Sequence, residues 1–117
     1  MTDKKRILFV DDDPRLLTGL EKVLHRDRAR WDMTFALGGE AALAELTAGP
    51  FDCVVTDLRM PDIDGAAVVA KVKHEHPGTP CVMLSGSDCP VADRVDELLV
   101  KPCSAQTLRA TLERLLH

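Results

Sequence analysis

Short apolar runs alternate with longer amphipathic stretches along the whole chain, and this alternation limits the possible folds more than any other feature. Amphipathic stretches between strand-length runs are typical of βαβ units, in which helices connect the strands of a parallel sheet. Several runs are continuously apolar, as expected for strands that are covered on both faces. The sequence therefore predicts an α/β fold with a doubly wound, five-stranded parallel sheet. The five runs are RILFVD, MTFAL, FDCVVTD, PCVMLS and ELLVK.

Four of the intervening or terminal stretches have helical patterns. The first helix is predicted to begin at Pro14, with Asp13 as its N-cap, and to end near Asp27. Apolar spacing and Gly-Pro or Pro-Gly stops define the next two, and Ser104 is the expected N-cap of the last. These three helices are predicted at residues 39–48, 65–76 and 104–116.

The fourth crossover differs from the others. Only residues 86–96 lie between the fourth and fifth predicted strands, about the minimum of ten residues for a parallel crossover. Gly86 and Pro90 further weaken the helical pattern in this segment. We therefore expect the fourth helix of the fold to be short or irregular.

The composition fits one domain over residues 1–117. A length of 117 residues with 45% apolar residues is enough for a single packed core. The net charge is -4, and the longest basic run is KKR. Nucleic-acid binders usually have a basic surface patch, so direct nucleic-acid contact is not expected. The apolar run of residues 7–10 is too short for a membrane span or a signal peptide, and a cytoplasmic location is expected.

The four cysteines are Cys53, Cys81, Cys89 and Cys103. They form no CxxC pair and no zinc-ligand spacing. We expect them to be reduced, with two of them in the core.

Polar residues follow the predicted strands at the points where these end. The first strand ends in Asp11 and Asp12, the third in Asp57, the fourth in Ser85 and the fifth in Lys101. In a doubly wound sheet, ligands bind outside the carboxyl ends of the strands, near the point where the strand order reverses. The sequence therefore predicts an acidic pocket at this edge, flanked by a hydroxyl and an ammonium group.

Such a pocket suits phosphoryl chemistry. Carboxylates that share a pocket repel one another unless a cation neutralises them. Mg²⁺ prefers oxygen ligands and retains waters that a phosphate can displace. An Asp beside the metal is a competent nucleophile toward phosphorus, while a Lys and a Ser can contact phosphoryl oxygens.

Four motifs occur in order over nearly the whole chain, and together they are highly specific. With ILFVDDDP, VVTDLRMPDIDG, VMLSG and LLVKPC, the chain resembles the receiver domain of two-component response regulators. The resemblance implies a flavodoxin-like sheet with strand order 2-1-3-4-5. It also implies a signalling domain rather than a turnover enzyme, limited to self-catalysed phosphoryl transfer and autodephosphorylation.

The resemblance assigns the acidic residues. Asp57 would be the phosphoacceptor and a ligand of Mg²⁺. Asp12 would bind the metal directly and Asp11 through water, and the backbone carbonyl of Arg59 would be a further ligand.

The resemblance also assigns the remaining polar residues. Ser85 would occupy the Ser/Thr switch position, and Lys101 would contact the phosphoryl group, with a cis bond to Pro102. Asp62 and Asp64, between Pro61 and Gly65, need no chemical role, because turn formation and capping of the third helix explain them.

The implied partners are a histidine kinase or phosphotransfer protein and an output domain or partner protein. One departure from the family concerns output: Leu98 stands where family members commonly have Tyr or Phe. Leucine can pack but has no hydroxyl group. We therefore hypothesise that the chain accepts phosphate and transmits the signal through an altered fourth helix.

Two alternatives remain open. The first is a receiver-like interaction module that is regulated independently of phosphorylation. The second is an aspartyl phosphatase of the haloacid-dehalogenase type, whose nucleophile would lie in the pattern Asp11-x-Asp13. That family needs further carboxylates after the Lys, and only Glu113 follows Lys101.

Overall fold

The predicted strands form one parallel sheet in the computed structural model, which describes residues 4–86 and 94–116. All four neighbouring pairs are parallel, and the strand order is β2-β1-β3-β4-β5. This confirms the order 2-1-3-4-5 and the flavodoxin-like architecture. The strands are β1 (Lys5–Asp11), β2 (Trp31–Leu37), β3 (Cys53–Asp57), β4 (Cys81–Ser85) and β5 (Glu97–Val100).

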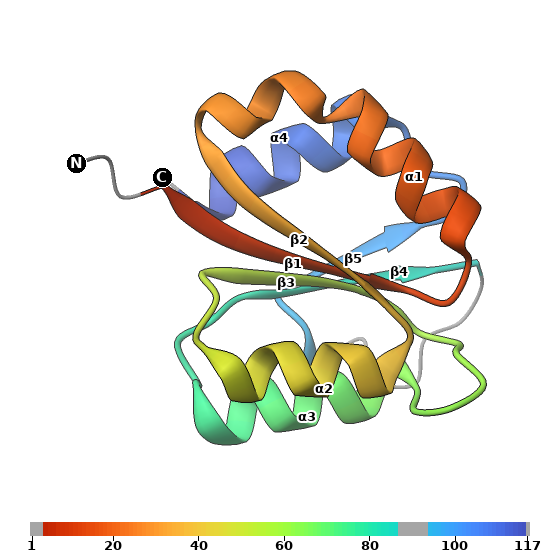
Figure 1. Ribbon diagram of the computed structural model, residues 1–117, viewed down its shortest axis with the longest axis vertical. Coiled ribbons are helices and arrows are strands. Elements are labelled where there is room, and N and C mark those ends of the chain that lie inside the picture. Colours follow the sequence, from red (N-terminus) through yellow and green to blue (C-terminus); the bar gives the residue numbers. More distant parts are fainter. Residues whose placement is uncertain (1–3, 87–93, 117) are drawn as a thin grey trace.

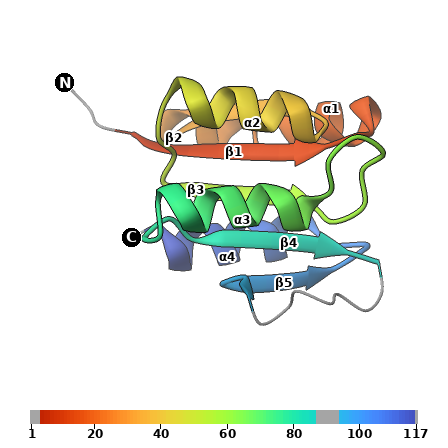
Figure 2. The ribbon, with the colours of Figure 1, turned by 90° about the horizontal axis from the view of Figure 1, so that it is seen from below.

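Helices cover both faces of the sheet. In Figure 1, α1 and α4 lie on one face, and α2 and α3 lie on the other. Figure 2 shows the arrowheads of β1, β4 and β5 pointing the same way, so their carboxyl ends share one edge. Within the described residues the helices are α1 (Pro14–Val23), the 3-10 helix η1 (His25–Ala29), α2 (Gly39–Ala48), α3 (Gly65–Glu75) and α4 (Ala105–Leu115).

Two apolar clusters hold the three layers together. Every residue of β3 and β4 is buried, because helices cover both sides of these central strands. Cys81 packs in the cluster under α2 and α3, and Cys53 packs in the cluster under α1 and α4. Burial raises the pKa of Cys53 to about 12 and that of Cys81 to about 11. Both are free thiols in the core, as predicted; Cys103 is partly exposed, and Cys89 lies outside the described residues.

Side-chain caps begin α1 and α4 where the sequence predicted them. The carboxylate of Asp13 accepts a hydrogen bond from the backbone N–H of Arg15, 2.9 Å away, and Pro14 opens α1. The hydroxyl of Ser104 accepts from the backbone N–H of Thr107 at 3.0 Å. Both caps satisfy N–H groups that have no partner inside the helix.

The first helix ends earlier than its sequence pattern suggests. The α-helical part stops at Val23, and a 3-10 turn continues to Ala29. The guanidinium group of Arg109 in α4 donates to the carbonyl of Val23 at 2.9 Å and to the buried carboxylate of Asp27 at 3.0 Å. Arg30 donates to the same carboxylate. These contacts come from distant parts of the chain, so local periodicity could not reveal them.

The predicted short or irregular helix falls on residues 86–96, of which 87–93 lie outside the described residues. The end of this crossover is held by Asp96, whose carboxylate accepts from the backbone N–H of Cys81 and from the ammonium group of Lys73, both at 2.7 Å. Among the described helices, none is both long and apolar enough to cross a membrane.

One glycine allows α3 to start directly against the end of β3. The N–H of Gly65 donates to the carbonyl of Leu58 at 2.7 Å. A Cβ atom at Gly65 would lie 2.2 Å from the backbone oxygen of Asp57. No real contact is that short, so a larger residue would push the helix away from the strand.

We therefore predict that Gly65→Ala destabilises the protein by about 1–3 kcal/mol, because the backbone must shift to admit the methyl group. Urea unfolding measures this loss. Gly19→Ala in α1 is the matched control, since a Cβ there meets nothing within 4 Å. That substitution should stabilise the protein by about 0.5–1 kcal/mol through helix propensity. Equal stability of Gly65→Ala and the original protein would contradict the close approach.

Candidate functional site

The carboxyl ends of four strands bring the predicted polar residues to one edge of the sheet. Asp11 ends β1, Asp57 ends β3 and Ser85 ends β4, and these residues are 2%, 8% and 4% exposed. Lys101 follows β5 directly, and its backbone N–H donates to the carbonyl of Ser85 at 2.9 Å. The central part of the predicted pocket is therefore built from buried carboxylates and a buried hydroxyl.

Lys101 is the cation of this cluster. Its ammonium nitrogen lies 2.9 Å from Oδ1 of Asp57 and 3.6 Å from Oδ2 of Asp11. Burial alone would lower the pKa of Lys101, but the hydrogen bond to Asp57 and the charge of Asp11 offset this and raise it. The peptide bond between Lys101 and Pro102 is cis, as the resemblance implied.

Asp11 is the least well satisfied group of the cluster. Its Oδ1 accepts a hydrogen bond from the backbone N–H of Asp13 at 2.9 Å, while its buried Oδ2 accepts none from the described residues. Burial raises the pKa of Asp11; the bond from Asp13 and the charge of Lys101 oppose the rise, and the charges of Asp57 and Asp12 add to it. A buried oxygen without a hydrogen bond is costly, so this position suits a further cation.

Three carboxylates lie close enough to share one ion. Oxygen atoms of Asp11, Asp12 and Asp57 all lie within 4.8 Å of one another. Asp12 is exposed, whereas the other two are buried, so the cluster opens to solvent on one side. An all-oxygen set of this kind could hold a hard metal ion.

The acids of the following loop have structural contacts instead. Asp64 caps α3, because its carboxylate accepts from the backbone N–H of Ala67 at 3.0 Å. Asp62 reaches across to α2, where it accepts from the N–H groups of Gly39 and Glu40. From its place between Pro61 and Gly65, Asp62 was expected to form a turn or to cap the third helix, and its contact with α2 was not predicted. The available signal was the absence of any capping side chain before α2.

Leu98 contributes to packing, as expected for its side chain. It is partly buried against the cluster under α2 and α3, together with Val95. The predicted role of the Arg59 carbonyl as a metal ligand stays a prediction, and the Arg59 side chain is exposed. Glu113, the one acid after Lys101, pairs with Arg30 at 2.8 Å.

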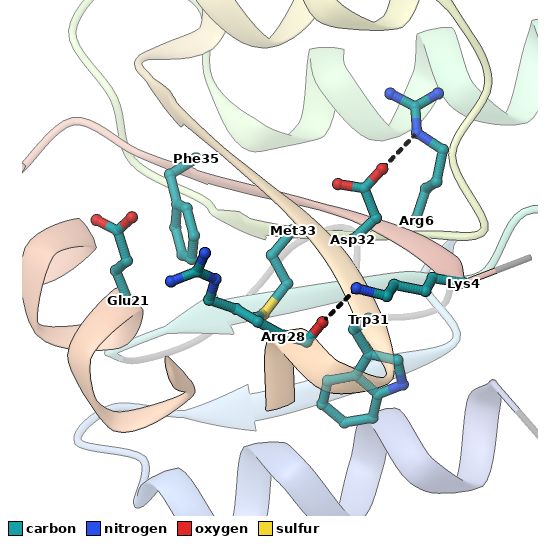
Figure 3. A pocket seen from close by; sticks show the side chains of 8 residues that line it. All are labelled: Lys4, Arg6, Glu21, Arg28, Trp31, Asp32, Met33 and Phe35. Carbon is teal, nitrogen blue, oxygen red and sulfur yellow. Dashed lines mark hydrogen bonds and ion pairs between the residues drawn. The ribbon is translucent and has the colours of Figure 1, made fainter. Parts of the chain in front are cut away.

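A groove of about 720 Å³ lies apart from the acidic cluster, beside β2 and η1 (Figure 3). Polar groups across it already contact one another. The ammonium group of Lys4 donates to the carbonyl of Arg28 at 2.8 Å, and the Arg6 guanidinium lies 3.6 Å from the Asp32 carboxylate. None of the predicted site residues lines this groove, so its volume does not make it the candidate functional site.

Relatives with curated descriptions match nearly the whole chain. The transcriptional regulatory protein TrcR of Mycobacterium tuberculosis is 34% identical over 119 residues, covering 96% of this chain and 45% of the relative. The transcriptional regulatory protein QseB of Haemophilus influenzae is 30% identical, covering 96% of this chain and 52% of the relative. The chain thus spans about half the length of the curated relatives it matches.

Solved structures match the fold over almost their full length. The response regulator TrrA from Thermotoga maritima, solved in complex with Mg²⁺-BeF, has a TM-score of 0.85 and 28% identity, covering 96% of this chain and 99% of that one. The chemotaxis response regulator CheY4 of Vibrio cholerae has a TM-score of 0.84 and 28% identity, covering 97% of this chain and all of that one. The family model described as response regulator receiver domain matches residues 7–113. The chain therefore belongs to the receiver domains of two-component response regulators.

Proposed function

We propose that Asp57 is the phosphoacceptor of this receiver domain. The observation that carries the proposal is the position of its carboxylate, which lies at the end of a central strand, 2.9 Å from Lys101 and beside Asp11 and Asp12. The Lys101 ammonium group can balance negative charge on an incoming phosphoryl group, and a cation held by Asp11 and Asp12 could do the same, which supports a nucleophilic role for Asp57.

The reaction transfers a phosphoryl group from a phosphorylated donor to the free carboxylate of Asp57. A carboxylate oxygen of Asp57 attacks the phosphorus of a phosphohistidine, and an acyl phosphate bond forms as the P–N bond breaks. The imidazole leaves with the bonding electron pair and takes up a proton. With acetyl phosphate as donor, a P–O bond breaks and acetate leaves. Attack by water on the phosphorus of the acyl phosphate later restores the Asp57 carboxylate and releases inorganic phosphate.

Two residues would contact the transferred group. The Lys101 ammonium group would pair with a phosphoryl oxygen, for which it must give up part of its contact with Asp57. The Ser85 hydroxyl would donate a hydrogen bond to another oxygen. Ser85 ends β4, the strand next to β3, and the Lys101 ammonium group lies 2.9 Å from Asp57 although it follows the edge strand β5. Both positions support a role as a switch that senses charge at Asp57.

Asp11, Asp12, Asp57 and the carbonyl of Arg59 would hold Mg²⁺. The fit is supported by the carboxylate oxygens within 4.8 Å of one another and by the buried Oδ2 of Asp11, which accepts no hydrogen bond within residues 4–86 and 94–116. When bound, the ion would neutralise negative charge on the phosphoryl oxygens and on the carboxylates.

The proposed partners follow from the family. A histidine kinase or phosphotransfer protein would phosphorylate Asp57 in the cytoplasm. The relatives named above are transcriptional regulators about twice as long, so an output domain or a partner protein would carry any DNA contact. The domain itself would act as a switch and not as a turnover enzyme.

One observation favours a second candidate, a receiver-like module regulated independently of phosphorylation. Leu98 packs against the core without a hydroxyl group, so it cannot report a movement of Ser85 through a hydrogen bond. The complete set of Asp11, Asp12, Asp57, Ser85 and Lys101 argues for the phosphorylated switch.

The phosphoacceptor assignment predicts that incubation with acetyl phosphate and Mg²⁺ adds one phosphoryl group and that Asp57→Asn abolishes this addition. Intact-protein mass spectrometry measures the mass gain. Asp64→Asn is the matched control, because Asn caps a helix about as well as Asp and the site is untouched. Unchanged uptake by Asp57→Asn would rule out the assignment.

The raised pKa of Asp11 predicts a conflict between folding and function. Because its folded-state pKa lies above that of the unfolded chain, ionised Asp11 opposes folding at neutral pH. With a chelator at pH 7, Asp11→Asn should therefore stabilise the protein by about 1 kcal/mol in urea unfolding. This advantage should shrink as the pH falls through the folded-state pKa of Asp11, where the original side chain takes up a proton.

The exposed neighbour provides the control for this prediction. Asp12→Asn should change stability in chelator by less than about 0.5 kcal/mol, as is usual for surface substitutions. A loss of stability for Asp11→Asn at pH 7 in chelator would contradict the unfavourable charge. In saturating Mg²⁺ the original protein should be more stable than Asp11→Asn, because metal binding stabilises only the protein with the complete site.

The two candidate functions differ in their response to a phosphoryl mimic. If the domain is a phosphorylated switch, Mg²⁺ with beryllofluoride should shift the amide resonances of β5, including those of Leu98 and Leu99. Mg²⁺ alone is the control. Resonance changes that stay confined to Asp57 and its loop would favour the phosphorylation-independent module.

A further inference from the structure

The proposed metal ligands come from the ends of β1 and β3, which the sheet joins, and from the loop that follows β3. Asp11 ends β1, whereas Arg59 lies in the loop of residues 58–64. The register between β1 and β3 stops at the pair Val10 and Thr56, before either segment.

The start of the loop is held by the N–H of Leu58, which donates to the carbonyl of Leu84 at 3.2 Å, and by the burial of Leu58 and Met60. A further contact joins the later part of the loop to the end of β1.

The carboxylate of Asp62, in this loop, binds the N-terminus of α2. Oδ1 accepts from the N–H of Gly39 at 3.2 Å, and Oδ2 accepts from the N–H of Glu40 at 3.0 Å. Hydrogen bonds from the backbone N–H groups of Glu40, Ile63 and Gly39 lower the pKa of Asp62, so the acceptor stays ionised. The N-cap residue itself, Gly38, has no side chain that could supply these bonds.

The turn that Asp62 binds is also fixed to Asp11. The N–H of Gly38 donates to the backbone oxygen of Asp11 at 2.8 Å. Gly38 has a φ of 93°, in the left-handed region that favours glycine. A Cβ atom at Gly39 would lie 2.3 Å from the backbone oxygen of Ile63. The two glycines thus let the turn lie between the end of β1 and the loop.

We propose that Asp62 is a positioning residue for the metal site. Through the Gly38–Gly39 turn, it fixes the loop that carries Arg59 relative to the end of β1 that carries Asp11. A helix cap from the N-cap residue itself would stabilise α2 and leave the loop free. Here the acceptor belongs to the loop, so loss of the two bonds would loosen the later part of the loop together with the helix end. The inference rests on the proposed function, because it assumes that these segments hold Mg²⁺.

The test is a titration with Mg²⁺ alone, in which amide chemical shifts report binding. Asp62→Ala should raise the Kd for Mg²⁺ about tenfold or more, the usual effect of removing a group that orients metal ligands. In metal-free protein, amide exchange of Gly39 and Glu40 should accelerate. A Kd within twofold of the original, with these amides exposed, would overturn the positioning role.

Two further variants separate position from charge. Asp62→Asn removes the charge but keeps one carbonyl oxygen that can cap α2, so its Kd should lie between those of Asp62→Ala and the original protein. Glu40→Gln removes a charge at the same helix end and should change the Kd by less than twofold. If Asp62→Asn matches Asp62→Ala and Glu40→Gln weakens binding equally, charge explains the effect and the proposal is wrong.

The same experiment distinguishes this inference from the proposed function. At saturating Mg²⁺, Asp62→Ala should still accept phosphate on Asp57 from acetyl phosphate. If the original protein neither binds Mg²⁺ nor is phosphorylated on Asp57, the proposed function fails and the positioning role with it. If the original protein does both and Asp62→Ala keeps its Mg²⁺ affinity, only the positioning role fails. Unfolding curves in chelator ensure that each variant is compared as folded protein, and Asp62→Asn supplies the comparison should Asp62→Ala not fold.

Discussion

The contact of one ammonium group with two buried carboxylates is the interaction on which the site depends. Lys101 lies 2.9 Å from Asp57 and 3.6 Å from Asp11, and without it two like charges would face each other in a place of low dielectric. Together with Asp12 the cluster has three carboxylates, and Lys101 balances the charge of only one of them. The cluster therefore remains negative, and the same excess charge that opposes folding favours a divalent cation.

The sheet explains why these charges are found at this edge. Helices cover both faces of β3 and β4, so polar side chains of these strands can reach solvent or a ligand only where the strands end. Asp57 is the last residue of β3, and Gly65 then lets α3 begin against the backbone of Asp57. The backbone of Asp57 is thus held by a strand on one side and by a closely packed helix on the other. If Asp57 is the phosphoacceptor, its position is fixed before any ligand arrives.

The sequence predicted those features that depend on local chemistry or strand periodicity. The strand ends placed Asp11, Asp57, Ser85 and Lys101 correctly, because parallel strands bring their carboxyl ends together. The strand order came from family resemblance, since nothing local decides which strands are neighbours. The 3-10 turn after Val23 was missed because Arg109 stabilises it from the other end of the chain. The contact of Asp62 with α2 was also missed, because its partners Gly39 and Glu40 lie more than 20 residues away in the sequence.

The backbone bond between Lys101 and Ser85 bears on how a signal could leave the site. A phosphoryl group on Asp57 adds a charge of about -1.5 to -2, and both residues would respond to it. Their backbones are already joined by the bond from the Lys101 N–H to the Ser85 carbonyl, at 2.9 Å. Leu98 shares its strand face with the exposed Val100 and contacts the core by apolar packing. The leucine side chain can form no hydrogen bond. A conformational change of β5 would therefore depend on how the Lys101 backbone moves with its ammonium group. The charge at Asp57 would then reach the surface of β5 through Lys101 and not through an aromatic side chain.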